Sequence, residues 1–86
     1  MSKRKKLYDK IMSSKHDNNI GYEEVCSLLR YLEFDSRQNG TSHIVFSKRE
    51  YDDIINLQNK NGKCKAYQIA QLRRFFRKEG IGDENL

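Results

Sequence analysis

Apolar residues recur at helical spacing in three stretches of the chain. In residues 22–32 they fall three or four positions apart along one face, at Tyr22, Val25, Leu28, Leu29 and Leu32. In residues 66–79 they are Ile69, Leu72, Phe75 and Phe76, and the following Gly80-Ile81 is typical of a Schellman helix ending. Residues 3–13 carry a narrower stripe around Leu7 and Ile11, after a possible cap at Ser2. The pattern predicts three helices.

Between the second and third helices the pattern changes to alternation, which predicts three strands at 34–38, 41–47 and 53–58. In the middle strand Ser42, Ile44 and Phe46 share one face, and Thr41, His43 and Val45 share the other. Asn39-Gly40 is expected to turn the chain between the first two strands, because both residues tolerate positive φ. Phe34, Ile55 and Leu57 are expected to point inward.

The predicted order is therefore α-α-β-β-β-α, an α+β fold with a small three-stranded antiparallel sheet and helices on one face. At 86 residues the chain is expected to be a single domain with one core. We divide it into an additional N-terminal helix at 1–15, a core at 20–81 and a frayed tail at 82–86. The second face of the sheet stays open, and His43 lies on it.

Charge is distributed in blocks. Residues 60–78 carry seven Lys/Arg and no acid, and residues 1–15 carry six Lys/Arg against Asp9. Residues 16–59 carry four Lys/Arg against eight acids. Two basic ends around an acidic middle indicate a polyanion-binding surface, and solvated helix faces are the simpler alternative.

Other features restrict the class of protein. No apolar run is long enough to span a membrane, and no signal-peptide core follows the basic N-terminus. Cys26 and Cys64 lack the spacing of a zinc site, and Cys26 is expected to be a small buried residue. Reduced thiols fit a cytoplasmic protein. We expect no metal and no small-molecule cofactor.

His43 is the candidate for chemistry, because an imidazole on an open face of a basic protein can move protons on a phosphodiester. The alternative is a surface histidine without a role. Lys60, Lys63 and Lys65, at the start of the third helix, are candidates to hold RNA phosphates, unless they serve only solubility. Further RNA-binding candidates are Ser42, which could also orient His43, and Arg73 and Arg74 on the face of the third helix opposite its core stripe. Tyr67 is expected to pack at the start of that helix rather than to stack on a base.

Several short segments together resemble one family of bacterial toxins. The segments 28–34, Gly40-Thr41-Ser42-His43-Ile44-Val45-Phe46, 54–58, Gly62-Lys63 and Lys65-Ala66-Tyr67-Gln68-Ile69 follow one another as in the HicA family. The resemblance covers roughly residues 20–81. It implies a fold like the double-stranded-RNA-binding domain and an mRNA endonuclease whose catalytic histidine is His43. It also implies a HicB-type antitoxin as protein partner.

The sequence departs from the family pattern at three positions. Glu33 stands where the family often has glycine, Ala66 where it often has proline, and Thr41 is an extra residue before Ser42-His43. The first two affect helix boundaries, and the third can shift the register of the histidine. The sequence shows no Asp/Glu cluster of the kind that holds magnesium, and we interpret the Asp52-Asp53 pair as a solvated loop and strand start. Metal-independent cleavage is therefore expected. Two alternatives stay open: a non-catalytic RNA-binding module of the same fold, and a domain that binds only a protein partner.

Overall fold

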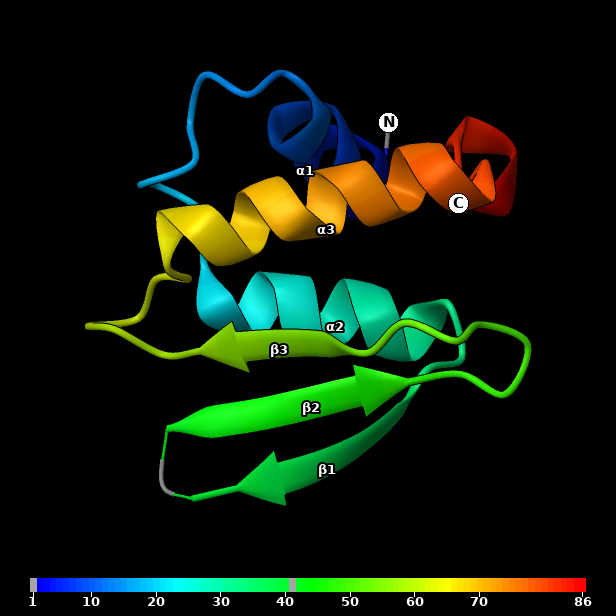
Figure 1. Ribbon diagram of the computed structural model, residues 1–86. Helices are drawn as coiled ribbons and strands as arrows, with labels where there is room; N and C mark the ends of the chain where they lie inside the picture. The colour runs from blue at the N-terminus through cyan, green and yellow to red at the C-terminus, as the bar shows by residue number, and fades with distance from the viewer. Residues whose placement is uncertain (1, 41) are drawn as a thin grey trace.

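The protein is described by a computed structural model covering residues 2–40 and 42–86, with the side chains of Asn39 and Asp83 outside the description. The helices are α1 (Lys3–Met12), α2 (Tyr22–Tyr31) and α3 (Ala66–Glu79), and a short 3₁₀ turn, η1, spans Asp83–Asn85. The strands are β1 (Asp35–Asn39), β2 (His43–Ser47) and β3 (Ile55–Gln58). Figure 1 shows α3 lying between α1 and β3, with α2 behind the sheet. The predicted α+β order of three helices and three strands is confirmed.

The sheet is an antiparallel meander in the order β1-β2-β3. Its register pairs Asn39 with His43 across the first hairpin and His43 with Gln58 across the second pair of strands. Ile44, Phe46 and Leu57 are at most 4% exposed, whereas the residues between them are half-buried or exposed. Helices therefore cover one face of the sheet, as expected, and His43 belongs to the other face.

The buried core combines that sheet face with all three helices. The largest fully buried side chains include Phe46 of β2, Phe76 of α3 and Ile11 of α1. Tyr8 also ties α1 to the chain end, since its hydroxyl donates to the Ile81 carbonyl at 2.8 Å. Helix α1 therefore contributes to the same core as residues 20–81 and is not an appendage to it.

The ends of α2 and α3 use the left-handed conformation. Gly80 has φ 67° and Ile81 N–H donates back to the Phe76 carbonyl at 2.9 Å, which confirms the predicted Schellman ending. Glu33 has φ 69° after α2, and Phe34 N–H donates to the Leu29 carbonyl at 3.0 Å. Glu33 thus occupies a position that favours glycine, which is the residue that the resembled family often has there.

Several boundaries differ from the prediction: α1 and α2 each end one residue earlier, β1 spans 35–39 and not 34–38, and larger differences occur in the other strands and at the chain end. Asn39 is still paired in β1, and β2 begins at His43, so Asn39-Gly40 is not a two-residue turn. The spacing question raised by Thr41 lies outside the described residues. Strand β3 begins at Ile55 and not at 53: its pairing with β2 ends at Phe46 with Ile55, and the Asp53 carboxylate bonds Lys78 at 2.9 Å. The tail is not frayed: Asn85 Oδ1 accepts the Gly82 N–H at 2.9 Å, and Leu86 packs on the core.

Candidate nucleic-acid interface

His43 begins β2 and lies half-buried on the uncovered face of the sheet. The Asn59 N–H donates to the Ser42 carbonyl at 2.9 Å, so residues 42 and 59 form a hydrogen-bonded pair. The next pair, His43 with Gln58, is then of the non-hydrogen-bonded kind, in which Cα atoms are about 4.5 Å apart. Gln58 is therefore the cross-strand neighbour of the imidazole, and it lies on the edge strand.

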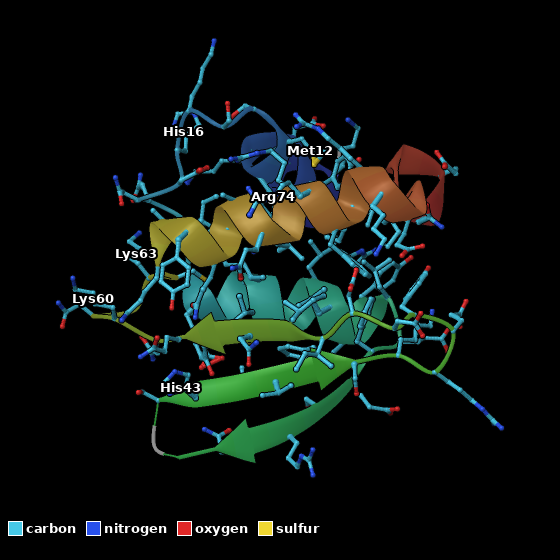
Figure 2. All side chains as sticks on the ribbon, in the orientation of Figure 1. Met12, His16, His43, Lys60, Lys63 and Arg74 are labelled. Atoms are coloured by element: carbon cyan, nitrogen blue, oxygen red, sulfur yellow. The ribbon has the colours of Figure 1, made fainter. Side chains whose placement is uncertain are left out.

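The imidazole of His43 has no hydrogen bond to another described side chain. The second histidine, His16, is exposed in the loop after α1, and Figure 2 shows it on the opposite side of α3 from His43. The two histidines therefore do not form an acid–base pair. Any second proton carrier in a reaction at His43 is a different group or water.

A tight turn beyond β3 carries the lysine candidates. Lys60 and Lys63 exchange two backbone hydrogen bonds of 2.8 and 3.0 Å, and the residues between them, Asn61 and Gly62, have φ 53° and 86°. Two positive φ values in a two-residue connection are the signature of a type I′ hairpin turn. The turn is anchored from both sides, because Asn59 Oδ1 accepts the Gly62 N–H and the Gly62 carbonyl accepts the Tyr22 N–H. A fixed backbone thus presents two exposed lysines.

These lysines line a surface depression together with the start of α3, which we call the lysine hollow: Asn18, Lys60, Asn61, Lys63, Cys64, Lys65 and Ala66. Lys65 is the N-cap residue of α3, its side chain makes no capping bond, and the first turn of the helix contains no acid. Within the described part of the chain, the N–H groups of Ala66 and Tyr67 have no acceptor. Three lysines therefore line one depression at the N-terminal end of α3, where an anion would be stabilised.

His43 and the lysine hollow lie at the same end of the molecule. Gln58 is paired with His43. Lys60 follows Gln58 by two residues, which places its backbone about 6.6 Å farther along the chain if the strand spacing continues. Figure 2 shows His43, Lys60 and Lys63 together at the end of the sheet where β2 begins. A nucleotide backbone held by the hollow can therefore extend towards the imidazole.

Ser42 does not share the face of His43. It lines a separate depression on the helix side of the sheet, next to Tyr22, Cys26, Arg30 and Ile44. Its carbonyl is used by the Asn59 N–H, and its hydroxyl makes no hydrogen bond to His43. Alternation along the strand separates the two side chains, so the structure does not support the option that Ser42 orients His43, and its contact with RNA stays a prediction.

The prediction that Arg73 lies on the exposed face of α3 is also wrong. Its residue is 9% exposed, and its guanidinium makes two bonds of 2.9 and 3.0 Å to the carboxylate of Asp17. A third bond, of 2.9 Å, reaches the Ile11 carbonyl near the end of α1. The hydrogen bond from Arg73 lowers the pKa of Asp17, against a smaller opposing effect of burial. Arg73 fastens the loop after α1 to α3, and its burial keeps the guanidinium away from the surface where RNA would bind.

Arg74 is exposed, as predicted, but it lies eight residues after Ala66, about 12 Å along the helix. It lines a groove between α3 and β3 together with Ile54, Asn56, Gln71 and Lys78. Figure 2 shows Arg74 near the middle of α3, away from Lys63. Arg74 can contact a polyanion only where that polyanion continues along the helix.

Sequence reasoning missed Gln58, the strand partner of His43, and Gln68, which bonds Gln58; for Tyr67 it gave the wrong environment. Gln58 follows the inward-pointing Leu57, so alternation alone places it on the face of the histidine. Gln68 is 2% exposed, and its Oε1 accepts the Gln58 N–H at 2.7 Å. Tyr67 was expected to pack at the helix start, yet it is 57% exposed. No pattern in the sequence indicates that a glutamine in α3 caps the edge of β3.

The remaining titratable groups do not build a metal site in the described part of the chain, where no cluster of three or more His, Cys, Asp or Glu side chains occurs. Cys26 and Cys64 are both free and buried, as expected for Cys26. Burial raises the pKa of Cys64 to about 12 and also raises the pKa of Cys26. Both residues therefore serve as small apolar core side chains.

Comparisons with protein-family models, with curated proteins and with solved structures found no match to this chain. No helix in the described residues has the length and apolar character needed to cross a membrane.

Proposed function

We propose that the protein is an endoribonuclease toxin of the HicA type, which cleaves mRNA with His43 as its proton-transfer group. The observation that carries the proposal is the position of His43 on the uncovered sheet face, at the same end as the lysine hollow. The resemblance of residues 20–81 to that family supports it. The element order of α2, the three-stranded sheet and α3 supports the proposal of a fold like the double-stranded-RNA-binding domain.

In the proposed reaction His43 removes the proton from a ribose 2′-hydroxyl, and the 2′-oxygen attacks the adjacent phosphorus. The bond from phosphorus to the 5′-oxygen breaks, and the leaving oxygen takes a proton from the imidazolium or from water. The products are a 2′,3′-cyclic phosphate and a 5′-hydroxyl end. Lys60, Lys63 and Lys65 hold neighbouring phosphates and lower the cost of the charge that develops on the phosphorane.

A nuclease with an open catalytic face endangers its own cell, so we further propose a HicB-type antitoxin as partner. Apart from Arg73, six Lys/Arg of residues 60–78 remain to attract it. An acidic surface on the antitoxin would cover the lysine hollow and His43, and its association should slow as salt is added. The His43→Ala protein is expected to bind this partner nearly as well as wild type, because an interface exceeds one imidazole.

One observation favours a second candidate, a non-catalytic RNA-binding module of the same fold. Among the described side chains none hydrogen-bonds to His43, so no neighbour fixes its ring for proton transfer. In that case the lysine hollow would be the functional site, and His43 would be one of several contacts.

The test is cleavage of a fluorescent single-stranded RNA by wild type, His43→Ala and His16→Ala, purified in parallel. His16 is the matched control, because it is the only other histidine and lies in an exposed loop. His43→Ala should cleave roughly 10²–10⁴-fold more slowly, and His16→Ala should equal wild type. Circular dichroism of both variants confirms that they are folded. Equal cleavage by folded His43→Ala would rule out His43 as the catalyst.

Two further arms separate the candidates. Cleavage should persist in excess EDTA and leave a cyclic phosphate; loss on chelation with recovery on adding magnesium would contradict the mechanism. RNA binding without any cleavage by wild type would establish the binding module instead.

The lysine hollow has its own test. In RNA binding by His43→Ala, adding Lys63→Ala and Lys65→Ala should reduce the log–log salt slope by about 0.7 for each phosphate that the protein no longer neutralises. Substitutions of Arg73 do not test phosphate binding, because Arg73 is buried. An affinity that does not change with salt would show that these lysines only solubilise the protein.

A further inference from the structure

Tyr67 is the most exposed aromatic residue beside the candidate site. It is the second residue of α3 and is 57% exposed, although aromatic side chains at helix starts often pack on the core. The core stripe of α3 begins with Gln68 and Ile69, and Tyr67 precedes both on the outer side of the helix. Exposure of a large apolar ring costs solvation free energy, so a ring held in this position is suited to contact a ligand.

The ring of Tyr67 is tethered by a buried amide. Gln68 Oε1 accepts the Gln58 N–H at 2.7 Å, which fixes the amide, and Gln68 Nε2 then donates to the Tyr67 hydroxyl at 3.3 Å. Gln58 is the cross-strand partner of His43. One glutamine side chain therefore links the phenol to the strand position opposite the candidate catalytic residue.

Tyr67 directly follows Ala66, the last residue of the lysine hollow in the sequence. Lys65 lies two residues before it, and Lys60 and Lys63 lie on the turn that leads from Gln58 to α3. The first turn of α3 contains no acid. A flat apolar surface with phosphate-binding groups beside it has the chemistry that recognises a nucleobase together with its own backbone.

We propose that Tyr67 is a stacking platform for one unpaired base of single-stranded RNA, whose adjoining phosphates lie in the lysine hollow. The inference rests on the proposed function, since it names the form of RNA that the same site takes. A base within a duplex has both faces covered by its neighbours, so it cannot stack on a side chain without leaving the helix. The site should therefore prefer single-stranded RNA. When one base stacks on Tyr67, the adjoining sugar–phosphate backbone should lie in front of the His43 imidazole.

The test measures RNA binding by fluorescence anisotropy in the non-cleaving His43→Ala background. Tyr67→Leu should weaken binding of a short single-stranded RNA by roughly 5- to 150-fold, the equivalent of removing one base–aromatic stack. Tyr67→Phe keeps the ring and should stay within about 3-fold of the parent. The salt slope should be the same for all three proteins, because the substitutions leave every phosphate-binding lysine in place.

Tyr31→Leu is the matched control, because Tyr31 is also an exposed aromatic, at 46%, but lies at the end of α2 beside Arg4. It should leave RNA binding unchanged. An RNA carrying 2-aminopurine gives a positive readout: its fluorescence should be quenched on binding to the parent and to Tyr67→Phe, and less so with Tyr67→Leu.

The outcomes separate this inference from the proposed function. If the parent binds RNA and Tyr67→Leu binds equally tightly, the platform is refuted and the RNA-binding function stands. If the parent binds no RNA at all, the proposed function fails first. If Tyr67→Leu binds RNA normally but loses a purified protein partner, the ring is a protein contact and the inference is wrong.

Discussion

The pair formed by Asp17 and Arg73 gives the sharpest test of how this fold is held together. Asp17→Ala leaves the Arg73 guanidinium, with a side chain only 11% exposed, bonded to the Ile11 carbonyl alone. Breaking a fully buried pair costs about 3–5 kcal/mol. Because the Asp17 side chain is 20% exposed and water can partly replace it, we expect a loss of about 2–4 kcal/mol.

That loss is large for a chain of this size, whose whole unfolding free energy is about 4–13 kcal/mol at ordinary values per residue. At a urea dependence of about 1 kcal/mol/M, the midpoint should fall by roughly 2–4 M in a titration followed by circular dichroism. Asp53→Ala is the matched control: its bond to Lys78 has a similar length, 2.9 Å, but both side chains are exposed, so the midpoint should barely move.

The pH dependence follows from the lowered pKa of Asp17. A carboxylate with a depressed folded-state pKa stabilises the protein above its unfolded pKa, about 3.9, and loses that contribution as the pH falls through the folded value. The difference between wild type and Asp17→Ala should therefore be full above about pH 5 and shrink in stronger acid. This account of the ion pair would be refuted if Asp17→Ala lowered the unfolding free energy no more than Asp53→Ala does. It would also be refuted if the stability difference between wild type and Asp17→Ala stayed the same in strong acid.

Two further predictions follow from backbone strain and from burial. Glu33→Gly should raise the unfolding free energy by about 0.5–1 kcal/mol, because Glu33 has φ 69°, and Gly80→Ala should lower it by about as much, since Gly80 has φ 67° and open space for a Cβ. Urea titrations measure both, and a destabilising Glu33→Gly would contradict the strain assigned to that helix end. Cys26 and Cys64 should react with Ellman's reagent at about pH 8 only as fast as the protein opens, because burial raises the pKa of Cys64 to about 12 and that of Cys26 as well. Rapid labelling of the native protein, at the rate seen in concentrated urea, would show that these thiols are accessible.

Periodicity predicted most of the fold because most of its determinants are local. The bounds 66–79 of α3 agree with the structure, since its apolar stripe and Gly80 specify the same end. The alternation around Ile44 and Phe46 placed His43 on the uncovered face correctly. Strand β3 was predicted to start too early because Ile54 fits an apolar strand pattern, yet it is 58% exposed. The pattern does not show that the pairing with β2 ends at Ile55, opposite Phe46.

The site was harder to predict, because its polar side chains are positioned by partners distant in sequence. Tyr67 is exposed beside a glutamine that bonds a strand ten residues earlier, and propensity carries no information about that bond. Lys60, Lys63 and Lys65 could be grouped because one turn and one helix start bring them together within six residues. The Asn61-Gly62 turn is a local feature, and it brings these lysines together. The hydrogen bonds that link Tyr67 through Gln68 to Gln58, the strand partner of His43, form only in the tertiary fold.

Arg73 shows that residue type alone is a poor guide to whether a side chain is exposed. Arg73 is four residues after Ile69 and three before Phe76, a spacing that fits the buried stripe, although the prediction placed it on the opposite face of α3. Its charge argued for the surface, because an unpaired buried guanidinium is too costly to keep. The missing partner was Asp17, 56 residues earlier in a polar loop, whose carboxylate matches the guanidinium in both bonds. Spacing was the better guide here: a cation at a core position predicts a buried acid elsewhere in the chain, and each acid in a loop is then a candidate partner.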